Sequence, residues 1–204
     1  GHAIGMAYMG MRPVVEMQFI DFIACAYNMV TNFAAKSRYR QGLACPMVIR
    51  GPSGGGVRGG PFHSQNVEAC FLNVPGLKIV APATAADAKG LMLSSIRDDD
   101  PVLFLEHKYL YRRIKEVVPS NEAIPLGQAI VRREGSDFTI VTYGAMVFEA
   151  LEAAEQIATE TGAQAEVIDL RTLAPLDMET VYQSVRKTNR CMLVHEACLT
   201  GGPS

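Results

Sequence analysis

The chain has 204 residues, of which 49% are hydrophobic and 20% charged, and its formal net charge at pH 7 is −2. This length suits one large domain or two smaller ones, and the composition is that of a soluble globular protein. A net charge so close to zero excludes a general attraction to nucleic acid or to an anionic membrane. No apolar run is long enough to cross a bilayer.

The first part of the chain alternates between strand and helix patterns. Apolar residues recur at every second position in the strands and at every third or fourth position in the helices. Thr84 and Asp87 form a capping box at the start of one helix, and Gly10 and Gly42 follow the ends of two others. We therefore predict strands over 14–19, 47–49, 78–81 and 102–105 and helices over 1–10, 23–40, 67–72 and 84–97.

Residues 106–125 interrupt this rhythm with prolines and cations that follow no regular period, which is typical of a linker between domains. A second run then predicts strands over 139–143, 165–170 and 191–194 and helices over 147–161 and 177–187. Both runs predict an α/β fold with a parallel sheet between helices. We place one domain at 1–118 and a smaller one at 119–204. Because neither end has the pattern of a terminus, we interpret both domains as truncated.

The five cysteines are scattered through the chain and show no CxxC spacing. They lie mostly within apolar runs, which predicts buried free thiols in a reducing compartment instead of disulfides or a zinc site.

A glycine-rich stretch over 50–65 holds six glycines and two prolines directly after the buried strand at 47–49. Such a stretch cannot form a stable helix or central strand, and a glycine loop that leaves a strand lets backbone approach a ligand closely. His63 near its end is the side chain in the stretch whose charge changes near neutral pH, so it is a candidate acid or base. A flexible surface loop with an incidental histidine explains this pattern equally well.

Eight short motifs are spread over the chain from end to end. They are Arg12–Glu16, Ala34–Lys36, Ile49–Pro52, His63–Gln65, Pro75–Pro82, Asp98–Pro101, Asp169–Leu173 and Pro175–Asp177. Together they resemble the beta subunit of thiamine-diphosphate-dependent 2-oxo acid dehydrogenases. The resemblance implies a transketolase-like pyrimidine-binding domain followed by a transketolase C-terminal domain.

What the resemblance implies about chemistry is oxidative decarboxylation of a 2-oxo acid on thiamine diphosphate and acyl transfer to a lipoyl group. The cofactor carries the hard chemistry, and the protein orients it. The implied partners are an alpha subunit that holds the diphosphate and its magnesium, a second beta subunit, and a lipoyl-bearing acyltransferase core. The implied location is the cytoplasm of a bacterium or the mitochondrial matrix of a eukaryote.

The resemblance also assigns site residues. Phe22 matches the aromatic residue that packs on the aminopyrimidine ring, Gln18 a polar residue near it, and His63 the active-site histidine. Plain core packing is the alternative for Phe22. The family's glutamate that protonates the aminopyrimidine has no counterpart after Gly1, so the chain alone is expected to be inactive. We interpret His2 and His107 as structural, and a catalytic role for His195 is not expected.

Three consecutive carboxylates, 98–100, follow the helix that begins at Thr84, where the helix dipole already presents negative charge. A solvated acidic turn is one explanation. The resemblance implies another, a potassium ion held by oxygen atoms, and oxygen-only ligation suits a hard cation. The residues that it assigns to the ion are Met47, Ser95, Ile96, Asp98 and Asp100.

The loops 108–112 and 195–202, together with Phe62, resemble the branched-chain members of the family more than the pyruvate members. We therefore expect a branched-chain 2-oxo acid as substrate, with a pyruvate or acetoin dehydrogenase beta subunit as the alternative. Transketolase and deoxyxylulose-phosphate synthase share the fold but fit the motifs around His63 and Asp98 less well. A non-catalytic fragment that serves as a subunit-interaction module is the alternative of another class.

Overall fold

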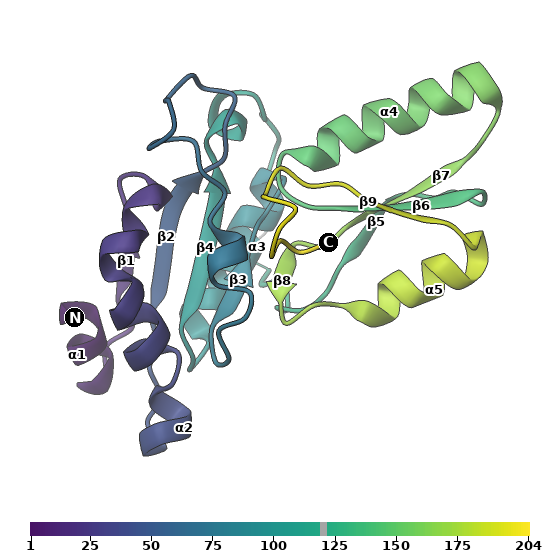
Figure 1. The fold of residues 1–204 in the computed structure, drawn as a ribbon. Helices are drawn as coiled ribbons and strands as arrows, with labels where there is room; N and C mark the ends of the chain where they lie inside the picture. Colours follow the sequence, from purple (N-terminus) through teal and green to yellow (C-terminus); the bar gives the residue numbers. More distant parts are fainter. Residues whose placement is uncertain (119–121) are drawn as a thin grey trace.

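The computed structural model describes residues 1–118 and 122–204, which form two α/β units, each built on its own sheet (Figure 1). The strands are β1 (Val14–Glu16), β2 (Val48–Ser53), β3 (Lys78–Val80), β4 (Val102–His107), β5 (Ile130–Arg133), β6 (Phe138–Thr142), β7 (Ala165–Asp169), β8 (Thr172–Ala174) and β9 (Cys191–Leu193). The α-helices are α1 (His2–Tyr8), α2 (Ser37–Gln41), α3 (Ala85–Arg97), α4 (Met146–Thr161) and α5 (Met178–Thr188). The predicted α/β class with two parallel-sheet units is confirmed.

The first sheet has the strand order β1-β2-β4-β3-β8, and its first four strands are parallel. Alternation along the strands sends side chains to two faces. Val48, Val102 and Phe104 pack with Leu91 of α3 on one face. Side chains on the other face, such as Ile49 and Leu103, pack with the helical segments of residues 20–34. The sheet is therefore buried on both sides, as its near-continuous apolar strands predict.

The helix predicted over 23–40 is wrong as a single α-helix. It is a 3₁₀ segment, Ile20–Ala26, then a π-helical segment, Met29–Ala34, and then α2, which ends at Gly42 with φ +67°. The Thr31 hydroxyl donates to the Tyr27 carbonyl at 2.9 Å, and such bonds to the preceding turn compete with the backbone ladder and bend helices.

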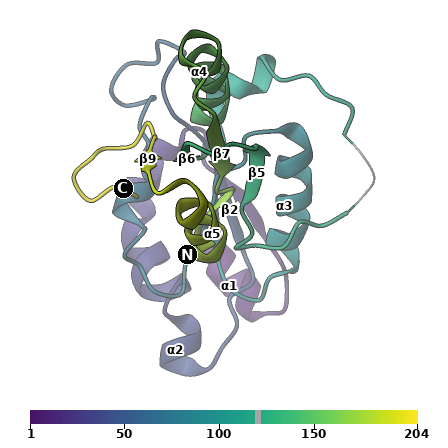
Figure 2. The ribbon, with the colours of Figure 1, turned by 90° about the vertical axis from the view of Figure 1, so that its right-hand side faces the viewer.

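The second sheet has the order β5-β7-β6-β9, with α4 on one face and α5 on the other (Figure 1). Both helices end where their sequences predict. Gly162 closes α4 with φ +79°, and the Asp177 side chain accepts a hydrogen bond from the Thr180 amide at the start of α5. Figure 2 shows α4 above the strands of this sheet and α5 below them.

Two strands were not predicted, and both are antiparallel to their neighbours. β5 pairs with β7, and β8 leaves the second unit to pair with β3 of the first sheet. The predicted linker is also partly wrong, because 106–107 belong to β4 and Lys108–Arg112 forms a 3₁₀ segment. The predicted first residue of the second domain, 119, lies outside the described residues.

A buried ion-pair network joins the two units beside β8. Arg132 of β5 pairs with Asp87 of α3 and lies 2.8 Å from Asp169, while Arg171 lies 3.2 Å from Asp87. The Asp87 and Asp169 side chains are 5% and 0% exposed, and removing Arg132 would leave Asp169 buried without an ion-pair partner. The network therefore fixes how the two units meet.

The cysteines are free, but only Cys45 is buried, so the prediction that the thiols are buried is wrong for the other four. None of the helices among the described residues combines the length and the apolar character that a membrane span needs.

Candidate active site

The site is built where β2 and β4 end side by side. Their parallel register places Ser53 opposite His107, and the chain leaves β2 at that point into a loop of residues 54–65, here called the glycine loop. The Gly54 amide donates to the Gln65 carbonyl at 3.0 Å, so the two ends of the loop meet. In parallel sheets, ligands bind at the carboxyl ends of the strands, which makes this edge the first place to look for chemistry.

His63 lies at this edge within a group of three rings. Its imidazole meets the ring of Phe19 edge to face with 4.4 Å between centroids, and that of Phe22 with 5.6 Å. The two phenylalanine rings are 5.9 Å apart, also edge to face. His63 is half-buried and Phe22 is 40% exposed, so the group has an open apolar face beside a titratable side chain. We call Phe19, Phe22 and His63 the aromatic cluster.

Two charged side chains support the base of the glycine loop. Asp21, which is 8% exposed, accepts a hydrogen bond from the Gln65 amide at 3.1 Å. The Lys108 ammonium donates to the Pro52 carbonyl at 3.3 Å and lies 5.8 Å from the Phe19 ring centroid. Burial lowers the pKa of Lys108 because desolvation disfavours its charged form. These contacts hold the ends of the glycine loop next to the aromatic cluster.

A carboxylate of the second unit reaches the same place. Glu196, which follows β9, accepts a hydrogen bond from the Gly55 amide at 2.7 Å, and its other oxygen lies 2.6 Å from Nε2 of His107. The hydrogen bond from His107 lowers the pKa of Glu196 below its usual range, and bonds from Gly55 and Asn66 act in the same direction. Glu196 is therefore an ionised acceptor between the two units.

A second carboxylate, from the first unit, accepts a hydrogen bond from the second unit. Glu68 of the first unit is 2% exposed and accepts a hydrogen bond from the Tyr143 hydroxyl of the second at 3.0 Å. Burial raises the pKa of Glu68, because its charged form loses its hydration. The ring of His195 stacks near Tyr143, with 6.3 Å between centroids. Glu68, Tyr143 and Glu196 line a cavity of about 20 Å³, which is room for one water molecule.

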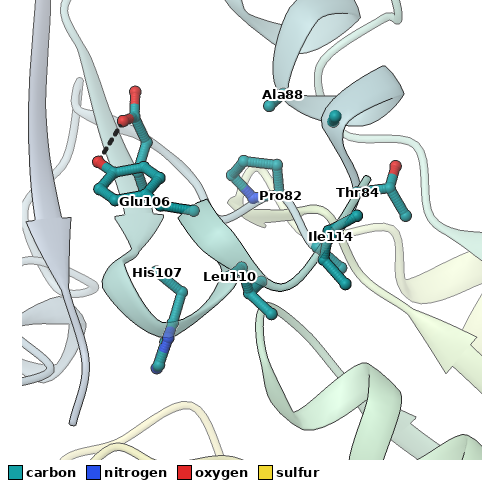
Figure 3. A pocket seen from close by; sticks show the side chains of 10 residues that line it. Pro82, Thr84, Ala88, Glu106, His107, Leu110 and Ile114 are labelled. Carbon is teal, nitrogen blue, oxygen red and sulfur yellow. Dashed lines mark hydrogen bonds between the residues drawn. The ribbon is translucent and has the colours of Figure 1, made fainter. Parts of the chain in front are cut away.

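A larger cavity, of about 260 Å³, lies on the other side of His107, between the end of β4 and the start of α3 (Figure 3). Its lining is mainly apolar, and its polar side chains are engaged. Glu106 binds Arg50 through both oxygens and accepts a bond from Tyr111 at 2.5 Å, while Thr84 caps α3. Its carboxylate and hydroxyl groups thus already have partners, so we place the chemistry at the aromatic cluster.

The residues predicted to hold potassium lie at the opposite end of the first sheet, before β4 begins. Arg12 donates to the carbonyl oxygens of Ile96 and Asp98, at 3.1 and 2.8 Å. Lys78 lies within 2.6 Å of both Asp98 carboxylate oxygens, and Arg38 binds Asp100 at 2.7 Å. The remaining two predicted residues also have partners, because the Met47 carbonyl accepts from the Val102 amide and the Ser95 hydroxyl donates to Leu91. These oxygen atoms thus already have protein partners, with side-chain cations at Asp98 and Asp100, and the potassium ion stays a prediction.

The structure therefore brings together two of the predicted site residues, Phe22 and His63. It places Gln18 on an exposed bend after β1. Sequence reasoning singled out neither Phe19, the last residue of the strand predicted over 14–19, nor Glu196, which lies in the loop 195–202. Its position directly after a strand of the second sheet was the available signal, because residues at strand ends often line sites in α/β proteins.

The two units of the chain match two known domain families. A model described as the transketolase pyrimidine-binding domain matches residues 1–114, and one described as the transketolase C-terminal domain matches residues 127–204. The chain belongs to the transketolase pyrimidine-binding domain family and continues into that C-terminal domain.

Among curated relatives, 2-oxoisovalerate dehydrogenase subunit beta of Bacillus subtilis is 52% identical over 199 residues, covering 96% of this chain and 61% of the relative. A Cupriavidus necator protein, acetoin:2,6-dichlorophenolindophenol oxidoreductase subunit beta, is 50% identical over 97% of this chain and 59% of its own. Pyruvate dehydrogenase E1 component subunit beta of Bacillus subtilis is 48% identical over 97% and 61%. The chain thus spans about three fifths of these relatives.

A solved structure titled "Split gene transketolase, inactive beta4 tetramer" matches all of this chain and 63% of its own, with a TM-score of 0.83 and 27% identity. The likeness extends over both sheets, so it also supports the way in which the two units are joined. These relatives and this structure describe what the chain is similar to.

Proposed function

We propose that this chain is part of the beta subunit of a 2-oxo acid dehydrogenase, with a branched-chain 2-oxo acid as its substrate. Three relatives of 48–52% identity are beta subunits, of 2-oxoisovalerate dehydrogenase, of acetoin:2,6-dichlorophenolindophenol oxidoreductase and of the pyruvate dehydrogenase E1 component. The observation that carries the proposal is the aromatic cluster. It combines an open aromatic face with a titratable imidazole at the carboxyl ends of the first sheet.

The aromatic cluster fits the aminopyrimidine part of thiamine diphosphate. Phe22 has an exposed face, and ring faces attract other rings beyond the gain from burial by about 0.5–1.5 kcal/mol. When bound, thiamine diphosphate supplies the electron sink for the loss of carbon dioxide. In this proposal Phe22 packs on the ring, Gln18 contributes a polar contact near it, and His63 delivers a proton to a lipoyl sulfur during acyl transfer.

The proposal includes partners and a second ion. An alpha subunit supplies the magnesium and diphosphate site, a second beta subunit completes the assembly, and a lipoyl-bearing acyltransferase core accepts the acyl group. A potassium ion is held among the oxygens of Met47, Ser95, Ile96, Asp98 and Asp100, and it shares the turn with Arg12. The 204-residue chain alone does not turn over a 2-oxo acid in this account.

The experiment is a substrate comparison on the assembled alpha–beta enzyme. We expect kcat/KM for 3-methyl-2-oxobutanoate to exceed that for pyruvate by about 10- to 100-fold, the selectivity that the side-chain methyl groups provide in an apolar pocket. A preference for pyruvate would reject the branched-chain assignment and keep the class. A preference for acetoin, which has no carboxylate to lose as carbon dioxide, would place the chain with the acetoin-oxidising relative instead. Failure of all three compounds to react, with thiamine diphosphate and magnesium present, would reject the class.

The second candidate is a pyruvate or acetoin dehydrogenase beta subunit, which relatives of 48% and 50% identity support. Differences of a few per cent in identity weigh little, because few residues decide between pyruvate and 3-methyl-2-oxobutanoate, which differ by two methyl groups.

A further inference from the structure

We propose that Glu196 is a positioning residue that clamps the two ends of the glycine loop and thereby holds His63 in the aromatic cluster. The inference rests on the proposed function of His63. Glu196 belongs to the second unit, and the loop that it binds belongs to the first, so the clamp couples the two units to the site.

The contacts reach both ends of the loop. One carboxylate oxygen of Glu196 accepts from the amide of Gly55, the second residue of the loop, at 2.7 Å. Asn66, the first residue after the loop, also hydrogen-bonds the Glu196 side chain. The backbones of Gly54 and Gln65 already hydrogen-bond each other where the loop begins and ends, a place here called the neck of the loop. Glu196 adds a second connection across this neck. A loop tied at its neck loses freedom along its whole length.

The neck is packed too tightly for side chains of its own. A Cβ at Gly54, where φ is +81°, would lie 1.9 Å from Nε2 of His107, and one at Gly55 would lie 2.9 Å from Glu196 Oε1. The glycines therefore leave room for the His107–Glu196 pair, whose polar atoms are 2.6 Å apart. Near the middle of the loop, a Cβ at Gly59 would lie 2.9 Å from Cβ of His63, so the loop backbone at Gly59 lies close to the histidine.

The acceptor is ionised, and bonds to charged groups are stronger than neutral ones. The groups that hydrogen-bond Glu196 are the His107 imidazole, the Gly55 amide and Asn66, all from the first unit, while Glu68 and Tyr143 face it across the small cavity. The Lys108 ammonium adds electrostatic attraction, because Glu196 is among the charges that act on its pKa. Glu196 itself need not contact the reacting atoms, because it acts by holding the glycine loop.

The first test is hydrogen exchange in the assembled enzyme, read from a peptide that contains Gly55. We expect Glu196→Ala to speed exchange there by about tenfold, since a charge-assisted hydrogen bond is lost. Glu196→Gln keeps an acceptor for Gly55 and a polar contact for His107, so it should stay within about threefold of wild type. Glu152→Ala, a change at an exposed position on α4, is the matched control and should leave the peptide unchanged. Unchanged exchange in Glu196→Ala would overturn the proposal.

The second test measures the two half-reactions. Glu196→Ala should slow acyl transfer to a lipoyl domain by about tenfold and change decarboxylation, followed with an artificial oxidant, by less than about threefold. Because Glu196 acts through His63, the double variant with His63→Ala should be no slower than His63→Ala alone. Additive losses, or faster exchange with unchanged transfer, would overturn the proposal.

These readouts separate the clamp from the proposed function. If His63→Ala transfers normally, the role of His63 is wrong, and exchange at Gly55 still decides whether Glu196 holds the loop. If Glu196→Ala fails to assemble, Glu196→Asp replaces it, because it keeps the charge and shortens the reach by one methylene group. The same exchange and transfer results then confirm or overturn the clamp.

Discussion

The guanidinium of Arg12 lies 2.8 Å from the carbonyl oxygen of Asp98, a residue that resemblance assigns to a potassium ion. A side-chain cation thus already compensates the negative end of α3, together with Lys78 and Arg38. Arg12 is 42% exposed, so its own contribution is screened by solvent and modest. A metal ion bound at the same turn would add to this compensation and would raise the stability of the folded protein.

We expect potassium to raise the melting temperature of the assembled enzyme in proportion to the logarithm of its concentration, because it binds the folded state alone. Arg12→Gln removes the competing cation and should steepen this dependence. The measurement is thermal unfolding in potassium, in sodium and in a bulky organic cation. Identical melting in all three salts, for both proteins, would show that the turn is neutralised by its own side chains and by water.

Glu68 predicts a dependence of stability on pH. Burial raises its pKa in the folded protein, so the folded state keeps the proton to a higher pH than the unfolded chain does. Rising pH between these two pKa values therefore removes stability. Glu68→Gln cannot ionise, so we expect it to melt above wild type near about pH 8 and to lose this advantage towards about pH 4.5. An advantage that is equal at both pH values would contradict the raised pKa, and Glu152→Gln is the exposed control.

Substitutions at two glycines of the loop distinguish the cost of backbone strain from the cost of a steric clash. Gly54 and Gly60 have φ values of +81° and +73°, but only the Cβ at Gly54 would strike a neighbour, His107. We expect Gly60→Ala to lower the free energy of unfolding by about 1–2 kcal/mol through strain. Gly54→Ala should cost about 3 kcal/mol or more, because His107 must also move. Denaturant unfolding of both variants measures the difference, and equal losses would mean that the neck of the loop has room to adjust.

Much of the fold was predictable because local signals agreed with it. Short apolar runs located β2, β4, β6 and β7, and the caps at Thr84 and Asp177 located the starts of α3 and α5. β5 and β8 were missed because each owes its strand conformation to a distant partner. β8 exists through its pairing with β3, almost a hundred residues earlier, and no local period reports that. The break in the helix of residues 20–41 accompanies the bond from the Thr31 hydroxyl to the Tyr27 carbonyl, which the apolar period does not report.

The candidate site divides in the same way. His63 and Phe22 were predicted because resemblance marks them, and the structure places their rings 5.6 Å apart. Phe19 and Glu196 were not predicted, because each contacts the site through residues that are distant in the sequence: Phe19 contacts His63, and Glu196 binds Gly55. Gln18 and the potassium residues remain predictions.

The most direct measurement compares the two half-reactions of His63→Ala in the full alpha–beta enzyme. His63 lies on the open aromatic cluster, where an acid can reach a substrate, and a positioned acid is typically worth about 10²–10⁴-fold in a proton-transfer step. We expect acyl transfer to a lipoyl domain to fall by about that factor, while carbon dioxide release with an artificial oxidant falls much less. Equal losses in the two half-reactions, or unchanged transfer, would contradict the account.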